Sequence, residues 1–376
     1  MSGEISPLPF IMIGPRVRKS PFFNATRLYG CKAYTVYNHM YMPLFYSDPL
    51  TDYWNLMNSV TLRDVACERQ VEISGPDAFR LSQFLTTRDV SKCDIGQCMY
   101  APLVDEHGGI LNDPVMLRLE ENKFWFSLAD SDILLWVKGL AFDNNYDVKI
   151  TEPRVSPLAV QGPRANALIA NLFGEWSTEL KFFRCRETEL KGIPLVLAHS
   201  GWSKQGGFEL YLQESRSGNE LWELIMEAGK PYGIAPGTPS AIERIESGLL
   251  SYGSDMDMTN NPFEVGLDVY INLEQEDDFI GKEALKVIKE KGLSQKLVGI
   301  EFSDKRVSGN ENRWPVYQGD KQCGTVRSAT YSPRLEKNIA LAMVSIDCAE
   351  PGTELKVQTP DLLVDTKVGK LPFISR

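Results

Sequence analysis

Hydrophobic and polar residues alternate in short stretches of the chain, as in β-strands. Between these stretches, hydrophobic residues recur every three to four positions, as in helices, so the chain divides into strand–helix units. Val71 and Ile73 alternate with polar neighbours, whereas Leu81 and Leu85 fall on one face of a helix that Gly75-Pro76-Asp77 opens. The same reasoning predicts strands at 157–161, 194–199 and 208–212, and helices at 163–173, 218–228 and 240–250.

Residues 97–129 predict a β-meander between these units. Its first strand contains 99–101, a Gly-rich turn follows at 107–109, and a polar turn separates β-rich runs at 114–119 and 123–129. A helix over 131–143 follows, for which Ser131 is the expected N-cap.

The character of the sequence changes near residue 295. Short β runs at 296–302, 324–330 and 339–346 are separated by Gly, Ser and Pro turns, which is typical of a small β-barrel or sandwich. We therefore expect an α+β protein in which two related α+β domains, 14–150 and 151–280, precede a C-terminal β-domain over 281–376. A ligand is expected in the central cleft between the domains, and the first dozen residues are expected to form a loose leader.

Composition narrows the class of protein. The chain has 376 residues and a net charge of −10, which argues against a nucleic-acid partner because such a partner requires a basic face. No segment reaches the roughly 20 apolar residues of a membrane span. The seven cysteines lack a C-x-x-C pair and zinc-ligand spacing. We therefore expect a cytoplasmic protein with reduced thiols, no metal site and no membrane association.

Common cofactor motifs are missing from the sequence. It contains no Gly-x-Gly-x-x-Gly run, no P-loop and no Gly-x-Ser-x-Gly elbow, so a nicotinamide, flavin or serine-hydrolase site is not indicated. The sequence does contain a series of other short motifs, which follow one another along the chain in this order: 160–163 (VQGP), 201–209 (GWSKQGGFE), 249–253 (LLSYG), 261–267 (NPFEVGL), 279–285 (FIGKEAL) and 324–328 (GTVRS).

This ordered series resembles the T-protein (aminomethyltransferase) family of folate-dependent one-carbon transferases, from about residue 27 to residue 345. The resemblance implies an enzyme with the three-domain aminomethyltransferase-like fold and with tetrahydrofolate in its central cleft. In that family the carboxylate at Glu209 pairs with the pterin edge, and the residue at Trp202 flanks the folate. The family residues that line the same pocket match Tyr100, Ser127, Leu128 and Ala129.

Three positions depart from the family pattern. The family run Gly-Gly-x-x-Asp-Asp reads 108–113 (GGILND) here, so that Asn112 stands at the catalytic carboxylate beside the folate N5. Asn112 is expected to serve as both a catalytic and a folate-contacting residue, although an amide does not ionise; the alternative is that Asp113 takes the role. The family's first Arg near the folate has become Ser240, and Lys204 adds a cation beside the pocket.

Residues 34–40 (YTVYNHM) resemble one branch of the family, the dimethylsulfoniopropionate demethylases. That resemblance implies methyl transfer from a sulfonium to tetrahydrofolate, a reaction in which the substrate already carries its positive charge. The expected substrate-binding residues are Tyr34, Tyr37, Trp202 and Lys204, and no lipoyl carrier protein is expected. The alternatives are a glycine-cleavage aminomethyltransferase, a non-catalytic folate-binding protein of iron–sulfur assembly, and a demethylase for another methylated amine or sulfur compound.

Overall fold

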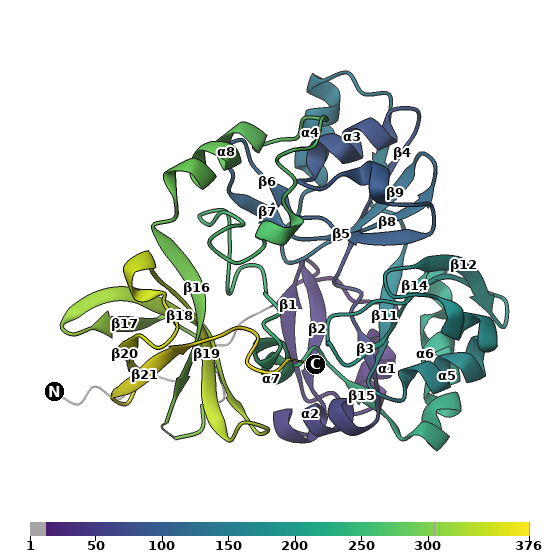
Figure 1. The fold of residues 1–376 in the computed structure, drawn as a ribbon. Coiled ribbons are helices and arrows are strands. Elements are labelled where there is room, and N and C mark those ends of the chain that lie inside the picture. The colour runs from purple at the N-terminus through teal and green to yellow at the C-terminus, as the bar shows by residue number, and fades with distance from the viewer. Residues whose placement is uncertain (1–12, 304, 308, 376) are drawn as a thin grey trace.

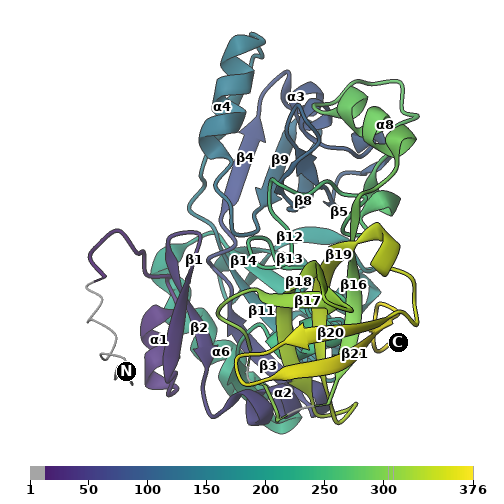
Figure 2. The same cartoon turned by 90° about the vertical axis from the view of Figure 1, so that its left-hand side faces the viewer.

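The computed structural model describes residues 13–303, 305–307 and 309–375, and the expected leader lies outside them. Two mixed sheet-and-helix halves and a barrel surround a common centre (Figure 1). The hairpin of β1 (Ala33–Tyr37) and β2 (Met40–Phe45) lies at one side of the molecule (Figure 2). The expected α+β fold with a C-terminal barrel is confirmed.

The first half contains a five-stranded antiparallel sheet covered on one face by α3 (Ala78–Leu85) and α4 (Leu134–Asp143). Its strands, in spatial order, are β10 (Lys149–Thr151), β4 (Gln70–Ser74), β9 (Lys123–Ser127), β8 (Val115–Glu120) and β5 (Gln97–Tyr100). Phe124 and Phe126 face the helices, and Trp125 lies on the other face, because side chains alternate along a strand.

The second half contains a six-stranded sheet covered by α5 (Ala165–Phe173) and α6 (Gly218–Gly229). Its strands, in spatial order, are β12 (Cys185–Leu190), β13 (Ile193–Ala198), β14 (Gly207–Leu212), β11 (Ser156–Gln161), β3 (Val60–Asp64) and β15 (Ile234–Gly237). On β14, Phe208 and Leu210 pack on the helices, whereas Tyr211 packs against Trp125 of the first sheet. The uncovered faces of the two sheets therefore meet.

The C-terminal barrel is closed (Figure 2). Its strands, in spatial order, are β16 (Gln295–Phe302), β19 (Lys337–Ser345), β18 (Lys321–Ser332), β17 (Trp314–Gln318), β20 (Glu354–Gln358) and β21 (Leu363–Gly369). Strands β18 and β19 contact α7 (Ala241–Glu246). Buried Glu246 accepts hydrogen bonds there from Tyr53 of α2 (Pro49–Asn58) and from Ser332 of β18, and forms an ion pair with Arg334. One carboxylate thus ties the barrel to the rest of the protein.

The remaining elements are short. They are α1 (Phe23–Leu28), the pair β6 (Leu103–Val104) and β7 (Ile110–Asn112), and α8 (Lys282–Lys291). Gly281 before α8 has φ +80°, and a Cβ on it would lie 2.4 Å from the carbonyl oxygen of Asp105. This close approach requires glycine in the 279–285 run and fastens α8 to the first half.

Three expectations differ from the structure. The helix expected over 240–250 ends at Glu246, because Gly248 adopts a left-handed φ of +66°. Helix α4 begins at Leu134 without the expected Ser131 cap; Asp132 Oδ1 accepts from the Leu134 N–H instead. The boundary at residue 150 does not separate the sheets, because β10 spans it and β3 pairs with the second half.

Candidate functional site

The site lies where the uncovered faces of the two sheets meet the β1–β2 hairpin. Residues next to the helix-facing positions on β5, β9 and β14 point toward this junction because of the two-residue period of a strand. They bring together residues that are distant in sequence: Tyr100, Ser127, Glu209 and Tyr211.

Glu209 is buried, and its Oε2 accepts hydrogen bonds from the hydroxyls of Ser200 and Tyr211. Burial raises the pKa of the Glu209 carboxyl, and these two hydrogen bonds oppose the rise. No partner for Oε1 occurs within the described part of the chain. One oxygen is therefore held in place while the other is left for a ligand.

Asp113 follows β7 and remains partly accessible. Tyr100 donates a hydrogen bond to Asp113 Oδ2 at 2.8 Å, whereas buried Oδ1 has no partner among the residues that the structure describes. Burial raises the pKa of the Asp113 carboxyl to about 7. An acid with such a pKa exchanges a proton readily near neutral pH.

Glu68 completes an acidic cluster with Asp113 and Glu209, and we use this name for the three residues below. Burial raises the pKa of Glu68 well above its usual range, and Glu209 and Asp113 add to the rise by repulsion. Within residues 13–303, 305–307 and 309–375, no lysine or arginine forms an ion pair with any of the three. Such a cluster favours a ligand that carries positive charge or N–H donors.

Asn112 is fully buried and directs its amide at the backbone. Its Nδ2 donates to the carbonyl oxygens of Ala129 (3.2 Å) and Ser131 (2.8 Å), and its Oδ1 accepts from the Ala129 N–H at 3.0 Å. These contacts use three of the four hydrogen bonds that an amide side chain makes. They favour a positioning role for Asn112 over the expected catalytic one, and leave the adjacent Asp113, whose Oδ1 has no partner among the described residues, as the ionisable group at this point.

Backbone groups near Ala129 are also engaged. The Ala129 carbonyl accepts a second hydrogen bond from Asn38 Nδ2 at 2.7 Å, and the Leu128 N–H donates to the Arg69 carbonyl. The Ser127 hydroxyl accepts from Gln70 at 3.1 Å. This segment therefore frames the site, but neither the Ala129 N–H nor its carbonyl is left for a folate.

The two β1 tyrosines that were expected to bind the substrate, Tyr34 and Tyr37, lie in different surroundings. Tyr37, next to Asn38, packs against the core of the second half and lies near the acidic cluster, since Glu68 and Asp113 add to the rise that burial causes in its pKa. Tyr34 donates or accepts a hydrogen bond with Thr26 and packs against Phe23 of α1, with ring centroids 5.2 Å apart. Tyr34 therefore belongs to a separate aromatic group.

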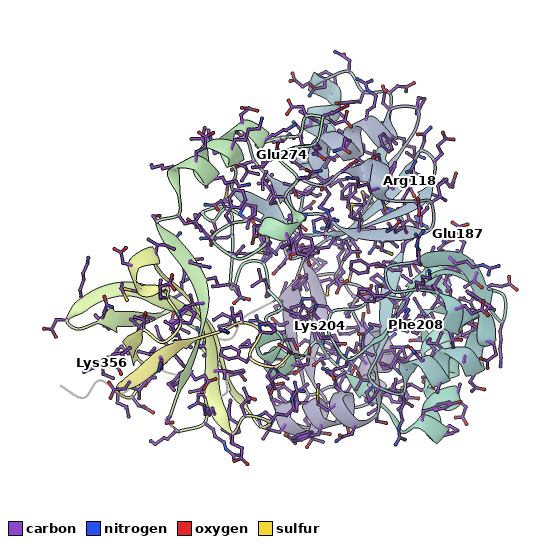
Figure 3. All side chains as sticks on the ribbon, viewed as in Figure 1. Arg118, Glu187, Lys204, Phe208, Glu274 and Lys356 are labelled. Atoms are coloured by element: carbon purple, nitrogen blue, oxygen red, sulfur yellow. The ribbon has the colours of Figure 1, made fainter. Side chains whose placement is uncertain are left out.

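Trp202 and Lys204 lie on the loop between β13 and β14, which rests on Gln161. Ser203 donates to Gln161 Oε1 at 2.6 Å, and a Cβ on Gly201 would lie 2.0 Å from Gln161 Nε2. The 160–163 and 201–209 runs are thus two parts of one structure. Trp202 is half-buried, whereas Lys204 is exposed, left-handed at φ +52°, and without an ion pair in the described residues. The position of Lys204 is labelled in Figure 3.

Ser240, at the family's arginine position, caps α7 by accepting a hydrogen bond from the Glu243 N–H at 3.2 Å. Sequence reasoning missed Glu68 and Tyr211, because a single Glu in a turn and a Tyr in a buried strand carry no motif. The described residues contain no group of three His, Cys, Asp or Glu side chains able to hold a metal. None of the described helices is long and apolar enough to cross a membrane.

Comparison with known proteins defines the class. Residues 22–275 match the GCVT N-terminal domain model, and residues 295–374 match the glycine cleavage T-protein C-terminal barrel domain model. The fold is similar to the glycine cleavage aminomethyltransferase T of Bartonella henselae, with a TM-score of 0.86 and 22% identity over 95% of this chain and 98% of that one. The chain therefore belongs to the glycine cleavage T-protein family of transferases.

Two relatives are more informative about the branch. The chain is 44% identical to the dimethylsulfoniopropionate demethylase DmdA of Ruegeria pomeroyi, over 92% of this chain and 94% of the relative. It is 31% identical to an aminomethyltransferase of Bacillus pumilus, over 96% and 99% of the two chains. The expected family and the expectation of a transferase enzyme are confirmed.

Proposed function

We propose that this protein is a tetrahydrofolate-dependent demethylase. It transfers a methyl group from the sulfonium of dimethylsulfoniopropionate to N5 of tetrahydrofolate and yields methylmercaptopropionate and 5-methyltetrahydrofolate. The observation that carries the proposal is the acidic cluster without an ion-pair partner in the described residues, in a chain 44% identical to a demethylase named for this substrate.

We assign Glu209 as the residue that binds the pterin ring. The aminopyrimidinone edge offers adjacent N–H donors, and charge-assisted hydrogen bonds to a carboxylate are stronger than neutral ones. Ser200 and Tyr211 orient the Glu209 carboxylate for this contact. Trp202 is assigned to the pterin face, where a half-buried indole can stack on it.

We assign Glu68, Asp113 and the Tyr37 ring as the groups that bind the sulfonium. Carboxylates attract the cation, and an aromatic face adds about 0.5–2 kcal/mol. Tyr34 and Lys204 are left out of this assignment, because Tyr34 packs on α1 and Lys204 is exposed. The tyrosine next to the hairpin turn is therefore the one we keep from the 34–40 run.

The reaction balances without an oxidant. The folate N5 forms a bond to the methyl carbon while the carbon–sulfur bond breaks, and its electron pair goes to sulfur to leave a neutral thioether. Positive charge moves from sulfur to N5, where the Asp113 carboxylate stabilises it and then accepts the N5 proton. Alignment of the two reactants supplies about 7–11 kcal/mol of the barrier reduction.

The test is turnover by the purified protein. Incubation with tetrahydrofolate and dimethylsulfoniopropionate is expected to produce equal amounts of methylmercaptopropionate and 5-methyltetrahydrofolate, measured by mass spectrometry. A parallel incubation with an aminomethyl-lipoyl carrier protein measures ammonia. Asn112 does not decide between these activities, because Asp113 supplies an ionisable group beside it. Ammonia release without methyl transfer would show a glycine-cleavage enzyme, and no turnover of either donor would favour a folate-binding protein.

Glu209→Ala is expected to weaken folate binding by more than about 1 kcal/mol, because it removes the acceptor for the pterin N–H groups. Calorimetry with tetrahydrofolate measures the change. Glu187→Ala, at an exposed position on β12 (Figure 3), is the matched control and should leave the affinity unchanged. Equal affinity of both variants would remove Glu209 from the folate site.

A further inference from the structure

Strand β18 of the barrel carries a β-bulge at Arg327, where its register with β19 shifts between Val326 and Ser328. Asn310 holds both sides of the bulge: its Nδ2 donates to the Arg327 carbonyl at 3.1 Å, and its Oδ1 accepts from the Ala329 N–H at 2.8 Å. Bulges redirect side chains near functional sites. The backbone at Arg327 is therefore built in a defined, supported conformation.

The Arg327 guanidinium is half-buried, and its Nε and Nη1 are both enclosed without a hydrogen-bond partner among the described residues. A guanidinium presents its N–H donors in a planar fork, and an enclosed donor without an acceptor costs about 1–3 kcal/mol. A carboxylate oxygen is the acceptor with which such guanidinium donors form their strongest hydrogen bonds, because these bonds are charge-assisted.

Neighbouring carboxylates are already bound elsewhere. Asp255 pairs with Arg244 at 2.6 Å and accepts from Ser328. Asp257 pairs with Arg313 at 3.2 Å, and Glu264 accepts from Asn260 and Gln295. Burial lowers the pKa of Arg327, repulsion from Arg313 lowers it further, and Asp257, Asp255 and Glu264 oppose this fall.

Arg327 lies on the part of the barrel next to α7 and the segment that contains Asp255 and Asp257. The next residue along β18, Ser328, accepts a hydrogen bond from Arg244 of α7 at 2.7 Å. The charge of Asp255 affects both Asp113 and Arg327: it raises the pKa of the Asp113 carboxyl and attracts the Arg327 guanidinium. The segment that contains Asp255 also contacts β7, the strand before Asp113: the Ile110 N–H donates to the Asn260 carbonyl, and the Tyr252 hydroxyl donates to the Ile110 carbonyl at 3.1 Å.

We propose that Arg327 binds a carboxylate of one of the two reactants of the transfer, through charge-assisted hydrogen bonds from the guanidinium N–H groups that lack a partner among the described residues. This inference rests on the proposed function, under which both reactants carry a carboxylate. The carboxylate is either the glutamate of tetrahydrofolate or the propionate of the sulfonium. Arg327 is then a binding residue and takes no part in proton transfer.

The test compares Arg327→Gln with Arg306→Gln, which removes an exposed barrel guanidinium and changes the net charge equally. Calorimetry measures the affinity of each variant for tetrahydrofolate, for the amide of tetrahydropteroate, which has no carboxylate, for dimethylsulfoniopropionate and for its methyl ester. Each ligand is added alone, so that binding is measured without turnover.

Arg327→Gln is expected to weaken one carboxylate-bearing ligand at least tenfold while its carboxylate-free analogue changes less than twofold. A loss confined to tetrahydrofolate assigns the folate tail, and a loss confined to the sulfonium assigns the propionate. Losses below twofold for both, or equal losses for acid and analogue, would overturn the proposal.

If Arg327→Gln does not fold, the same binding measurements on Arg327→Lys and on the wild-type protein still test the proposal. The lysine variant retains the charge without the planar fork and is expected to weaken the same ligand alone. Wild-type protein that binds acid and analogue equally well for both reactants would also overturn the proposal. Binding through Arg327 in a protein that transfers no methyl group would contradict the proposed demethylation and support this inference.

Discussion

Replacing Asp113 with asparagine is expected to lower the rate constant of methyl transfer by about 100-fold or more, the size of effect typical of a proton-transfer group. The carboxylate would no longer stabilise the charge that arrives at N5 or accept the N5 proton. The amide oxygen of the variant still accepts the Tyr100 hydrogen bond, so the fold should be retained. Stopped assays of 5-methyltetrahydrofolate formation measure the loss.

The pKa of Asp113 also predicts the direction in which the rate changes with pH. The pKa of Asp113 is raised to about 7, and the reaction needs the ionised form. For wild-type protein, kcat/KM should therefore rise as pH increases through about 7, whereas Asp113→Asn should lack this component. Asp143→Asn, at an exposed position on α4, is the control for loss of one negative charge. Activity of Asp113→Asn within twofold of wild type would exclude a role for the Asp113 carboxylate in the reaction.

The largest effect on stability is expected from Asn112→Asp. The change replaces an NH₂ group that donates to two carbonyl oxygens, those of Ala129 and Ser131, by an oxygen that repels them. The Ala129 carbonyl keeps its hydrogen bond from Asn38, but the Ser131 carbonyl loses its donor. This loss and the buried charge should lower the free energy of unfolding by about 2–5 kcal/mol at pH 8. Urea denaturation followed by circular dichroism measures this loss.

The loss should shrink as pH falls. Burial among carbonyl oxygens raises the pKa of the introduced carboxyl above the value of about 3.9 in the unfolded chain. The penalty is therefore full at high pH and declines as the carboxyl becomes protonated and can donate a hydrogen bond. Asn166→Asp, exposed at the start of α5, should change stability by less than about 0.5 kcal/mol. An unchanged unfolding free energy for Asn112→Asp would contradict the assigned contacts.

Local patterns predicted most helices and strands, because alternation and helical spacing are properties of neighbouring residues. The strand at 208–212 and the helix that stops at Gly174 both follow from such patterns. The partner of β3 did not, since pairing depends on contacts across about 100 residues, such as Val160 with Leu62. Helix α7 ended early because Gly248 lies in the left-handed region, which spacing alone does not reveal.

The amino-acid order alone was enough to establish the family, because motifs such as 160–163 and 201–209 are read along the chain. It did not reveal that Gln161 supports the Gly201 loop, that Asn112 is used up by backbone carbonyls, or that Glu68 joins Asp113 and Glu209. Those facts arise only when two sheets, a hairpin and a barrel are packed together, because burial, repulsion and hydrogen-bond partners belong to neighbours in space rather than in sequence.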